Sequence, residues 1–364
     1  MAGLSNLKRV LGSSLHRGGT GNLAADSDIA FRGFGFLNVR AFSSVEVVET
    51  GNWQTQDEVK LHKVRCLLSE YGFTTDQITR VYKYSPSKFR TAETLSPKLA
   101  FFRSILGPND DVARVVAANP QMLCYSLENK LMPNYQFVKS ILGRDELVAK
   151  SIRRSSSLLY MDVQKNLAVK VSFLRESGLP CSSIAKLMEH SPRVLAMSSF
   201  SKLEESVKKA MNLGFDPSNP VFVSAIRAIC QINGSIWDRK VELYRKWGWS
   251  NDDFLSAFKK HPFIMCISEE KINKGMDVFL NIFGFRSSDI VKYSYLMLLS
   301  VEERIVPRCS VIALLVSKGF LDDSPSTYAK ALCAREEIFV ERFVDKYPEH
   351  VLELWQKVRR KAVV

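Results

Sequence analysis

Lysine and arginine recur at comparable places along this 364-residue chain, which carries a formal net charge of +13. Most stand within short segments whose apolar residues have helical spacing, and Arg193 and Arg227 lie near the ends of such segments. Cations repeated along one face of a scaffold can bind successive phosphates of a nucleic acid, and each contact adds salt-dependent affinity without reading sequence. The candidates for phosphate contact are Arg80, Lys83, Arg114, Lys150, Arg153, Arg154, Lys186, Arg193, Arg227, Lys259, Lys260 and Lys292.

The densest basic group is residues 150–154, KSIRR, whose cations lie three and four positions apart and therefore share one helix face. A solvated helix surface explains any single cation at least as well as phosphate binding does. The recurrence of the positions favours phosphate binding for the set. Three tyrosines near the same segment ends, Tyr84, Tyr160 and Tyr295, have the chemistry to stack on a base, although packing inside the protein is the favoured interpretation.

Residues suited to catalysis do not converge in this sequence. It holds no GxxxxGK[ST] phosphate loop, no HExxH and no GxSxG. His62, His190, His261 and His350 are isolated from one another, and acidic pairs such as Glu269-Glu270 have no accompanying acid–base partner. The sequence therefore predicts a protein that is not an enzyme and that needs no cofactor or metal.

The seven cysteines form no CxxC pair and no cluster with zinc spacing. Their number is odd and most fall within apolar helical patterns. We therefore expect buried free thiols in a reducing compartment. The apolar runs are short and interrupted by charge, so no membrane-spanning helix is expected.

Residues 1–42 differ in composition from the rest of the chain. They are rich in Gly, Ser and Leu and hold five basic against two acidic residues, which is typical of an organelle transit peptide. The run Arg40-Ala41-Phe42-Ser43 resembles a mitochondrial processing signal and predicts cleavage after Phe42. Residues 43–58 would then be a linker. The predicted destination is the mitochondrial matrix; the plastid stroma and an ordinary disordered tail are the alternatives.

Eight glycines divide the chain at intervals of 34 to 36 residues, which indicates an internal repeat. A large apolar residue stands about five positions before most of them, and an apolar residue usually follows directly. This pattern predicts that each glycine takes the left-handed position that ends a helix, with the next residue folded back on the last turn. The eight glycines are Gly72, Gly107, Gly143, Gly178, Gly214, Gly248, Gly284 and Gly319.

A second, shorter helix is expected after each glycine, because Thr, Ser, Asn or Asp side chains that can cap a helix follow it in most units. In four units a proline closes this helix 13 or 14 residues after the glycine, and a small apolar plug follows. These prolines are Pro86, Pro120, Pro192 and Pro262; Ser156 stands in that place in the third unit. Three first helices are expected to start on proline, at Pro97, Pro133 and Pro307.

These units of ~35 residues predict an all-α solenoid over residues 59–355, with one concave and one convex face and a basic tail at 356–364. A glycine–aromatic break, a short capped helix and a proline followed by Leu or Met resemble the repeat of the mTERF (mitochondrial transcription termination factor) family. The segments SGLPCSSIAKLMEHSPRVLAMS and WGWSNDDFLSAFKKHPFIMCIS are particularly similar to it.

The resemblance implies a right-handed α-solenoid of about eight repeats that acts in mitochondria or plastids. Family members serve in transcription termination or initiation, intron splicing, and ribosome assembly or translation. Some bind double-stranded DNA along a basic concave path, and others bind RNA or protein. We therefore expect a monomeric nucleic-acid-binding regulator, with double-stranded DNA slightly favoured over RNA and with organelle transcription, splicing or ribosomal proteins as further partners. The alternative is a protein-binding scaffold in organelle ribosome assembly or translation.

Overall fold

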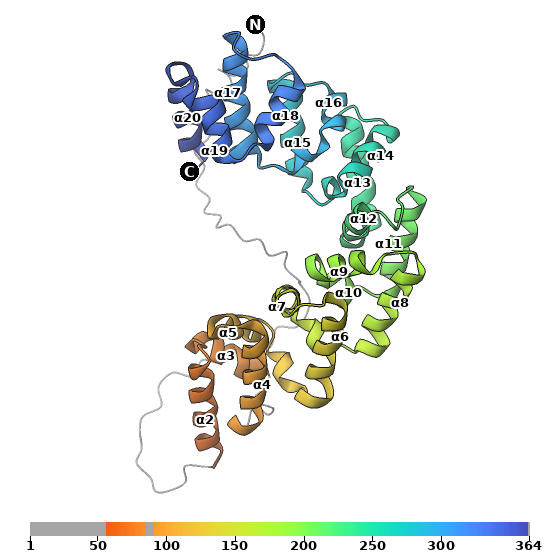
Figure 1. Ribbon diagram of the computed structural model, residues 1–364, viewed down its shortest axis with the longest axis vertical. Coiled ribbons are helices and arrows are strands. Elements are labelled where there is room, and N and C mark those ends of the chain that lie inside the picture. Colours follow the sequence, from red (N-terminus) through yellow and green to blue (C-terminus); the bar gives the residue numbers. More distant parts are fainter. Residues whose placement is uncertain (1–55, 85–90, 363–364) are drawn as a thin grey trace, which may run out of the picture.

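The computed structural model describes residues 56–84 and 91–362, and the regular structure in this part of the chain is entirely helical. Successive helices pair and stack into a curved array with the outline of a C (Figure 1). The predicted all-α solenoid is confirmed. The transit peptide expected at 1–42, and the linker expected at 43–58 up to residue 55, lie outside the described residues.

Each unit contains a first and a second helix. The first helices are α2 (Gln56–Glu70), α4 (Ala92–Leu106), α6 (Met132–Leu142), α8 (Ala168–Glu176), α11 (Phe200–Asn212), α13 (Gly234–Lys246), α15 (Glu269–Asp277) and α17 (Val306–Ser317). The second helices are α3 (Thr75–Tyr84), α5 (Asn109–Ala118), α7 (Asp145–Arg154), α9 (Cys181–His190), α12 (Val221–Gln231), α14 (Asn251–Lys260), α16 (Ser287–Lys292) and α18 (Pro325–Cys333).

The turn between the two helices of a unit forms as the glycine spacing predicts. All eight glycines have positive φ, between +70° and +88°. After Gly248 the backbone N–H of Trp249 donates to the carbonyl of Tyr244 at 3.2 Å, and the two rings stack with centroids 4.5 Å apart. The residue after the glycine therefore folds back on the last helical turn, as a Schellman motif requires.

The apolar plug after the second helix is itself a short helical turn. These third turns are η1 (Pro120–Cys124), η3 (Ser156–Leu159), α10 (Pro192–Ala196), η5 (Pro262–Met265) and η7 (Ser294–Leu298). Their apolar side chains, such as Leu195, Ile264 and Met265, are buried. The unit therefore has three helical elements where the sequence predicts two and a plug. The fifth unit lacks a separate third turn, because α12 is followed directly by α13.

Proline at the start of the first helices is only partly as expected. Pro133 and Pro307 stand in the first turn of α6 and α17, but a π turn precedes each of these helices: η2 (Leu127–Leu131) and η8 (Val301–Ile305). The helical segment therefore begins about one turn before the proline. Pro97 lies inside α4, so the prediction that it starts that helix is wrong.

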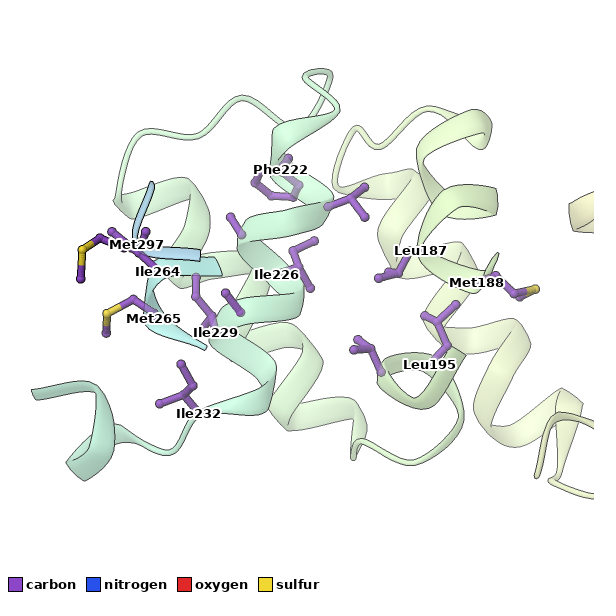
Figure 2. Packing of buried hydrophobic residues seen from close by; sticks show 14 of the residues in the cluster. Leu187, Met188, Leu195, Phe222, Ile226, Ile229, Ile232, Ile264, Met265 and Met297 are labelled. Atoms are coloured by element: carbon purple, nitrogen blue, oxygen red, sulfur yellow. The ribbon is translucent and has the colours of Figure 1, made fainter. Parts of the chain in front are cut away.

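Like elements of neighbouring units pack on one another and form three columns. In the second-helix column, α7 packs on α9, α9 on α12, α12 on α14 and α14 on α16. The third turns form another column, in which α10 contacts α12 and η5 contacts η7. Figure 2 shows the seam between these columns, where Ile226 and Ile229 of α12 lie between Leu195 and Ile264. Each unit thus buries its apolar stripe against its neighbours.

A last helix pair follows the eighth unit. It consists of α19 (Glu336–Phe339), the π turn η9 (Val340–Asp345) and α20 (Pro348–Ala362). Trp355 of α20 packs on Phe339 with ring centroids 5.2 Å apart. Because α20 runs to Ala362, residues 356–362 continue this helix, whereas the sequence predicts a separate basic tail from residue 356.

All seven cysteines are free thiols. The expectation that most of them are buried is wrong, because Cys66, Cys181, Cys266 and Cys333 are exposed. Each lies within a helical element or at its end. Cys309 in α17 is fully buried, and burial raises the pKa of its thiol.

Candidate nucleic-acid interface

Some lysine and arginine side chains form hydrogen bonds inside the units and are therefore unavailable to a ligand. The buried ammonium group of Lys170 in α8 donates to the carbonyls of Leu195 and Ser198 at 2.8 and 2.5 Å. Lys240 in α13 makes the same contact with Met265 at 2.8 Å. These carbonyls end the third turn of the same unit. The residues that reach carbonyls at the end of a third turn, or at the end of the second helix where the unit has no third turn, lie in the first helices or, for Arg304, in the π turn η8 before α17. They are Lys98, Asn134, Lys170, Lys202, Lys240, Lys271, Arg304 and Arg308.

None of these eight residues is among the sequence-predicted site residues. A signal for them was present, since Lys98, Asn134 and Lys170 are spaced by 36 residues. In units where the corresponding position holds the small residue Ser206 or Gly275, a lysine one helical turn earlier makes the contact. Burial lowers the pKa of Lys170, as expected for an ammonium removed from water.

Arg153 of the second-helix column ties the third unit to the second, and Arg114 supports its partner Asp111 from within α5. Arg153 donates to the carbonyl of Leu106 at 2.6 Å and lies 2.9 Å from a carboxylate oxygen of Asp111. Arg114 pairs with the same Asp111. Hydrogen bonds from Arg114 and the charge of Arg153 hold the pKa of this carboxyl below its usual value.

The other cations of the KSIRR group are also engaged. Lys150 lies 2.8 Å from the carboxylate of Glu189 in the next unit, and Arg154 donates to the backbone carbonyl of Glu189 at 2.7 Å. The hydrogen bond from Lys150 lowers the pKa of Glu189. The densest basic group of the sequence thus holds adjacent units together, with its charge partly balanced.

Another group of predicted cations is exposed and has no hydrogen-bond or ion-pair partner within residues 56–84 and 91–362. Three of them, Lys83, Lys259 and Lys260, stand in the last turn of a second helix, where a cation also suits the negative end of the helix dipole. Lys292 is also exposed, but it is left out of this set because its ammonium lies 5.3 Å from the centre of the Tyr293 ring. The exposed, unpaired set is Arg80, Lys83, Lys186, Arg193, Lys259 and Lys260.

In the first-helix column, cations pair with carboxylates of the following unit at two unit boundaries. Arg239 of α13 pairs with Glu269 of α15 at 3.2 Å, and Lys274 pairs with Glu302 of the following unit. These pairs run along the array and balance part of the charge that the first-helix column exposes. The second-helix column, from α9 to α16, exposes cations in excess.

Arg227 of α12 has a distinct environment. Its guanidinium lies 4.7 Å from the centre of the Phe263 ring, and its Nε atom is buried without a hydrogen-bond partner. Burial lowers the pKa of Arg227, and the groups that act on it electrostatically are Cys266 and the like-charged Arg154. An arginine remains protonated in proteins, so a half-buried cation stands here without a carboxylate.

The three tyrosines that could stack on a base differ in their surroundings. Tyr160 stacks on Tyr125 with centroids 5.4 Å apart and planes at 10°, and Tyr295 meets the His261 ring edge-on at 5.4 Å. Packing within the protein therefore accounts for much of both surfaces. Tyr84 is 50% exposed at the end of α3.

The second-helix column does not keep to one side of the array. In Figure 1, α3, α5 and α7 border the inside of the curve in the lower arm, whereas α14 and α16 border its outside in the upper arm. The helices of this column therefore lie on different sides of the curve in its two arms, and the single basic concave groove expected from the sequence stays a prediction.

A family model described as mTERF matches residues 66–236 and 223–339, which together span most of the chain. The chain belongs to the mTERF family. This mTERF protein is also similar to "Transcription termination factor MTERF8, chloroplastic" of Arabidopsis thaliana, with 22% identity over 215 residues. The match takes in 59% of the chain and 43% of that relative, so it spans less than half the relative's length.

Two features of residues 56–84 and 91–362 bear on the predicted chemistry. In that part of the chain no three His, Cys, Asp or Glu side chains lie close enough together to hold a metal ion. None of its helices combines the length and apolar character needed to cross a bilayer.

Proposed function

We propose that this mTERF protein binds nucleic acid in an organelle and regulates gene expression there by docking its second-helix column along phosphates. The observation that carries the proposal is the charge contrast between the columns. In the first helices, cations such as Arg239 pair with carboxylates at the surface, and others such as Lys170 are buried against carbonyls. Lys186, Lys259 and Lys260 of the second helices are exposed without a counter-charge. Such cations release counterions when they meet phosphates, which drives association.

The finer form of the proposal concerns the ligand and the process. Double-stranded DNA is the first ligand to test and RNA the second, and the process is transcription termination or initiation, or RNA processing. The name of the Arabidopsis relative, a transcription termination factor, supports the first process. The mitochondrial matrix remains our proposed location, with the plastid stroma as the alternative that the same name favours.

A salt titration tests the proposal. Binding of labelled duplex DNA and of single-stranded RNA is measured by fluorescence anisotropy at a series of salt concentrations. We expect the logarithm of the binding constant to fall linearly with the logarithm of salt concentration, with a slope of about −3 to −6. Absence of binding to both polymers at low salt would reject the proposal.

The second candidate function is a scaffold that binds protein. One surface favours it: a cavity of about 340 Å³ between α8 and α11, lined by Val169, Phe173 and Phe200 among others. Val169 and Phe200 are exposed although apolar. Co-sedimentation of the full chain with purified organelle ribosomes, lost on Phe200→Glu, would favour this function when nucleic-acid binding is absent.

A further inference from the structure

Hydrogen bonds and ion pairs join neighbouring units in the first half of the array. The side-chain amide of Asn109 in the second unit donates to the carbonyl of Glu70 in the first at 3.0 Å. Arg153 joins the second unit to the third, and Lys150 and Arg154 join the third to the fourth. Such bonds weaken steeply when their distance or angle changes, so they fix how one unit sits on the next.

The units after the fifth are joined in the same way. The hydroxyl of Ser287 in the seventh unit donates to the carbonyl of Trp247 in the sixth at 2.9 Å. The ion pair made by Arg239 crosses the same boundary, and Lys274 of the seventh unit pairs with a carboxylate of the eighth. The array therefore has two arms, one on either side of the fifth unit, whose units are fixed to one another by polar contacts.

The fifth unit, residues 199–232 with α11 and α12, is held differently. Among the described residues, one hydrogen bond crosses its boundaries, between the hydroxyl of Ser198 in the fourth unit and the thiol of Cys230 at 3.4 Å. A thiol is a weak hydrogen-bonding group. In residues 56–84 and 91–362, no ion pair connects the fifth unit to the fourth or to the sixth.

Apolar and aromatic packing holds the fifth unit between its neighbours. The rings of Phe173 and Phe200 meet at 5.3 Å on one side, and those of Phe215 and Phe258 meet at 5.5 Å on the other. Two cations of the fifth unit also lie over rings of the sixth. Figure 2 shows Ile226 of α12 within an apolar seam that continues into both neighbours. Such packing is not directional and lets helices slide by small steps.

Two further features loosen this part of the array. The fifth unit has no separate third turn, so α12 alone packs on both α10 and η5. A cavity of about 340 Å³ lies between α8 and α11, at the boundary with the fourth unit. Side chains that line a cavity have fewer neighbours to hold them in place. Because α11 and α12 lie midway along the C (Figure 1), a small shift between them and their neighbours moves the ends of the array by a larger distance.

We propose that the fifth unit is a joint between two stiffer arms, at which small sliding movements of α11 and α12 change the curvature of the array. One arm consists of the first four units, and the other runs from the sixth unit to α20. A ligand or partner that contacts both arms would select one curvature, because it stabilises the conformation with which it makes the better contacts. The joint belongs to the fold itself and is independent of the ligand that the protein binds.

Three exposed cysteines allow the joint to be tested in the full-length protein. Cys181 begins α9 in the fourth unit, Cys266 follows η5 in the sixth, and Cys333 ends α18 in the eighth. Double electron–electron resonance measures the distribution of distances between two spin labels. One variant keeps the pair at 181 and 266, the other keeps the pair at 266 and 333, and alanine replaces the remaining cysteines. Each pair spans two unit boundaries, but only the first pair spans the fifth unit.

We expect the distances between labels at 181 and 266 to spread about twice as widely as those between labels at 266 and 333. The second pair shares one labelled site with the first and crosses boundaries that polar contacts fix, so it is the matched control. Thermal melting of both variants confirms that they are folded. Equal widths for the two pairs would overturn the inference, because the fifth unit would then be as stiff as the arm that follows it.

A second measurement tests whether the polar contacts cause the stiffness. Arg239→Gln combined with Ser287→Ala removes two contacts between the sixth and seventh units, and should broaden the distances between labels at 266 and 333. Arg245→Gln is the control, because the partners of Arg245, Glu242 and Asn251, lie within the sixth unit. Ser287→Ala alone is used if the double variant does not fold. Broadening no greater than that of Arg245→Gln would also overturn the inference.

Discussion

The Nζ atom of Lys240 lies 2.8 Å from the carbonyl oxygen of Met265, 25 residues further along the chain. The same interval separates Lys170 from Leu195, and Asn134 from Leu159. Carbonyls at the end of a helical turn have no partner within it and carry its negative pole. A side-chain donor from the first helix forms a hydrogen bond with them and fixes the third turn against the first helix.

Replacing Lys240 by methionine should therefore destabilise the protein. The carbonyls of Met265 and Ile267, 2.8 and 2.7 Å from the ammonium, would lose their donor inside the protein. Loss of the buried charge offsets part of this cost, so we expect about 1–3 kcal/mol less free energy of unfolding, measured in urea. Lys246→Met on the exposed side of the same helix should change it by less than ~0.5 kcal/mol. Equal stability of the two variants would contradict the role given to Lys240.

Gly143→Ala should cost about 1 kcal/mol of unfolding free energy, because φ is +76° and a β-carbon there is strained. No atom lies within 4 Å of the added carbon, so the cost isolates the backbone conformation. Gly234 also has open space and lacks a positive φ. Urea unfolding should show Gly234→Ala as neutral or stabilising, and a loss equal to that of Gly143→Ala would argue against the conformational explanation.

Arg153 and Lys260 should respond differently to the same substitution. Arg153→Gln breaks the contacts with Leu106 and Asp111 and should lower the free energy of unfolding by about 1 kcal/mol, with little effect on nucleic-acid affinity. Lys260→Gln should leave stability unchanged, weaken binding and reduce the salt slope by about 1. Urea unfolding and the salt titration measure the two effects. The reverse pattern would show that Arg153 contacts the ligand.

Acid should destabilise the contacts between units. The pKa values of Asp111 and Glu189 are lowered in the folded protein, by Arg114 and Lys150 respectively as the leading causes. Their contribution is present above the unfolded-state values of about 4 and is lost as the pH falls through the lower folded-state values. The urea midpoint should drop between pH 7 and pH 3. For Asp111→Asn the difference from wild type should shrink at pH 3; a constant difference would exclude this linkage.

Sequence reasoning predicts the repeat well where a local rule governs the backbone. The backbone at the eight glycine turns has positive φ, where a residue with a β-carbon is strained, so the position requires glycine. This requirement is visible in the spacing of the glycines alone. Pro120, Pro192 and Pro262 mark the end of the second helix for a similar reason, since proline cannot continue it. The third turns are harder to predict, because four or five apolar residues are too few to show a helical period.

The site was less predictable because non-local contacts decide which cations remain available. A lysine on an amphipathic helix is expected to be solvated, yet Lys240 is buried against carbonyls of its own unit. Arg153, like Lys260, is a cation in the last turn of a second helix, but it donates a hydrogen bond to the carbonyl of Leu106, 47 residues earlier. Arg227 shows the same dependence, because only the fold brings its guanidinium within 4.7 Å of the centre of the Phe263 ring, 36 residues later.

The carbonyl contacts made by the first helices also bear on how such a chain changes in evolution. Lys98, Asn134, Lys170 and Lys240 each join two segments of one unit, and each of the second to eighth units has a contact of this kind. Duplication or loss of a whole unit would leave these hydrogen bonds in the remaining units intact, and the neighbouring units could keep the same packing of like helices. The array can therefore grow or shorten in steps of one unit, and the length of ligand that it follows would change by the same step.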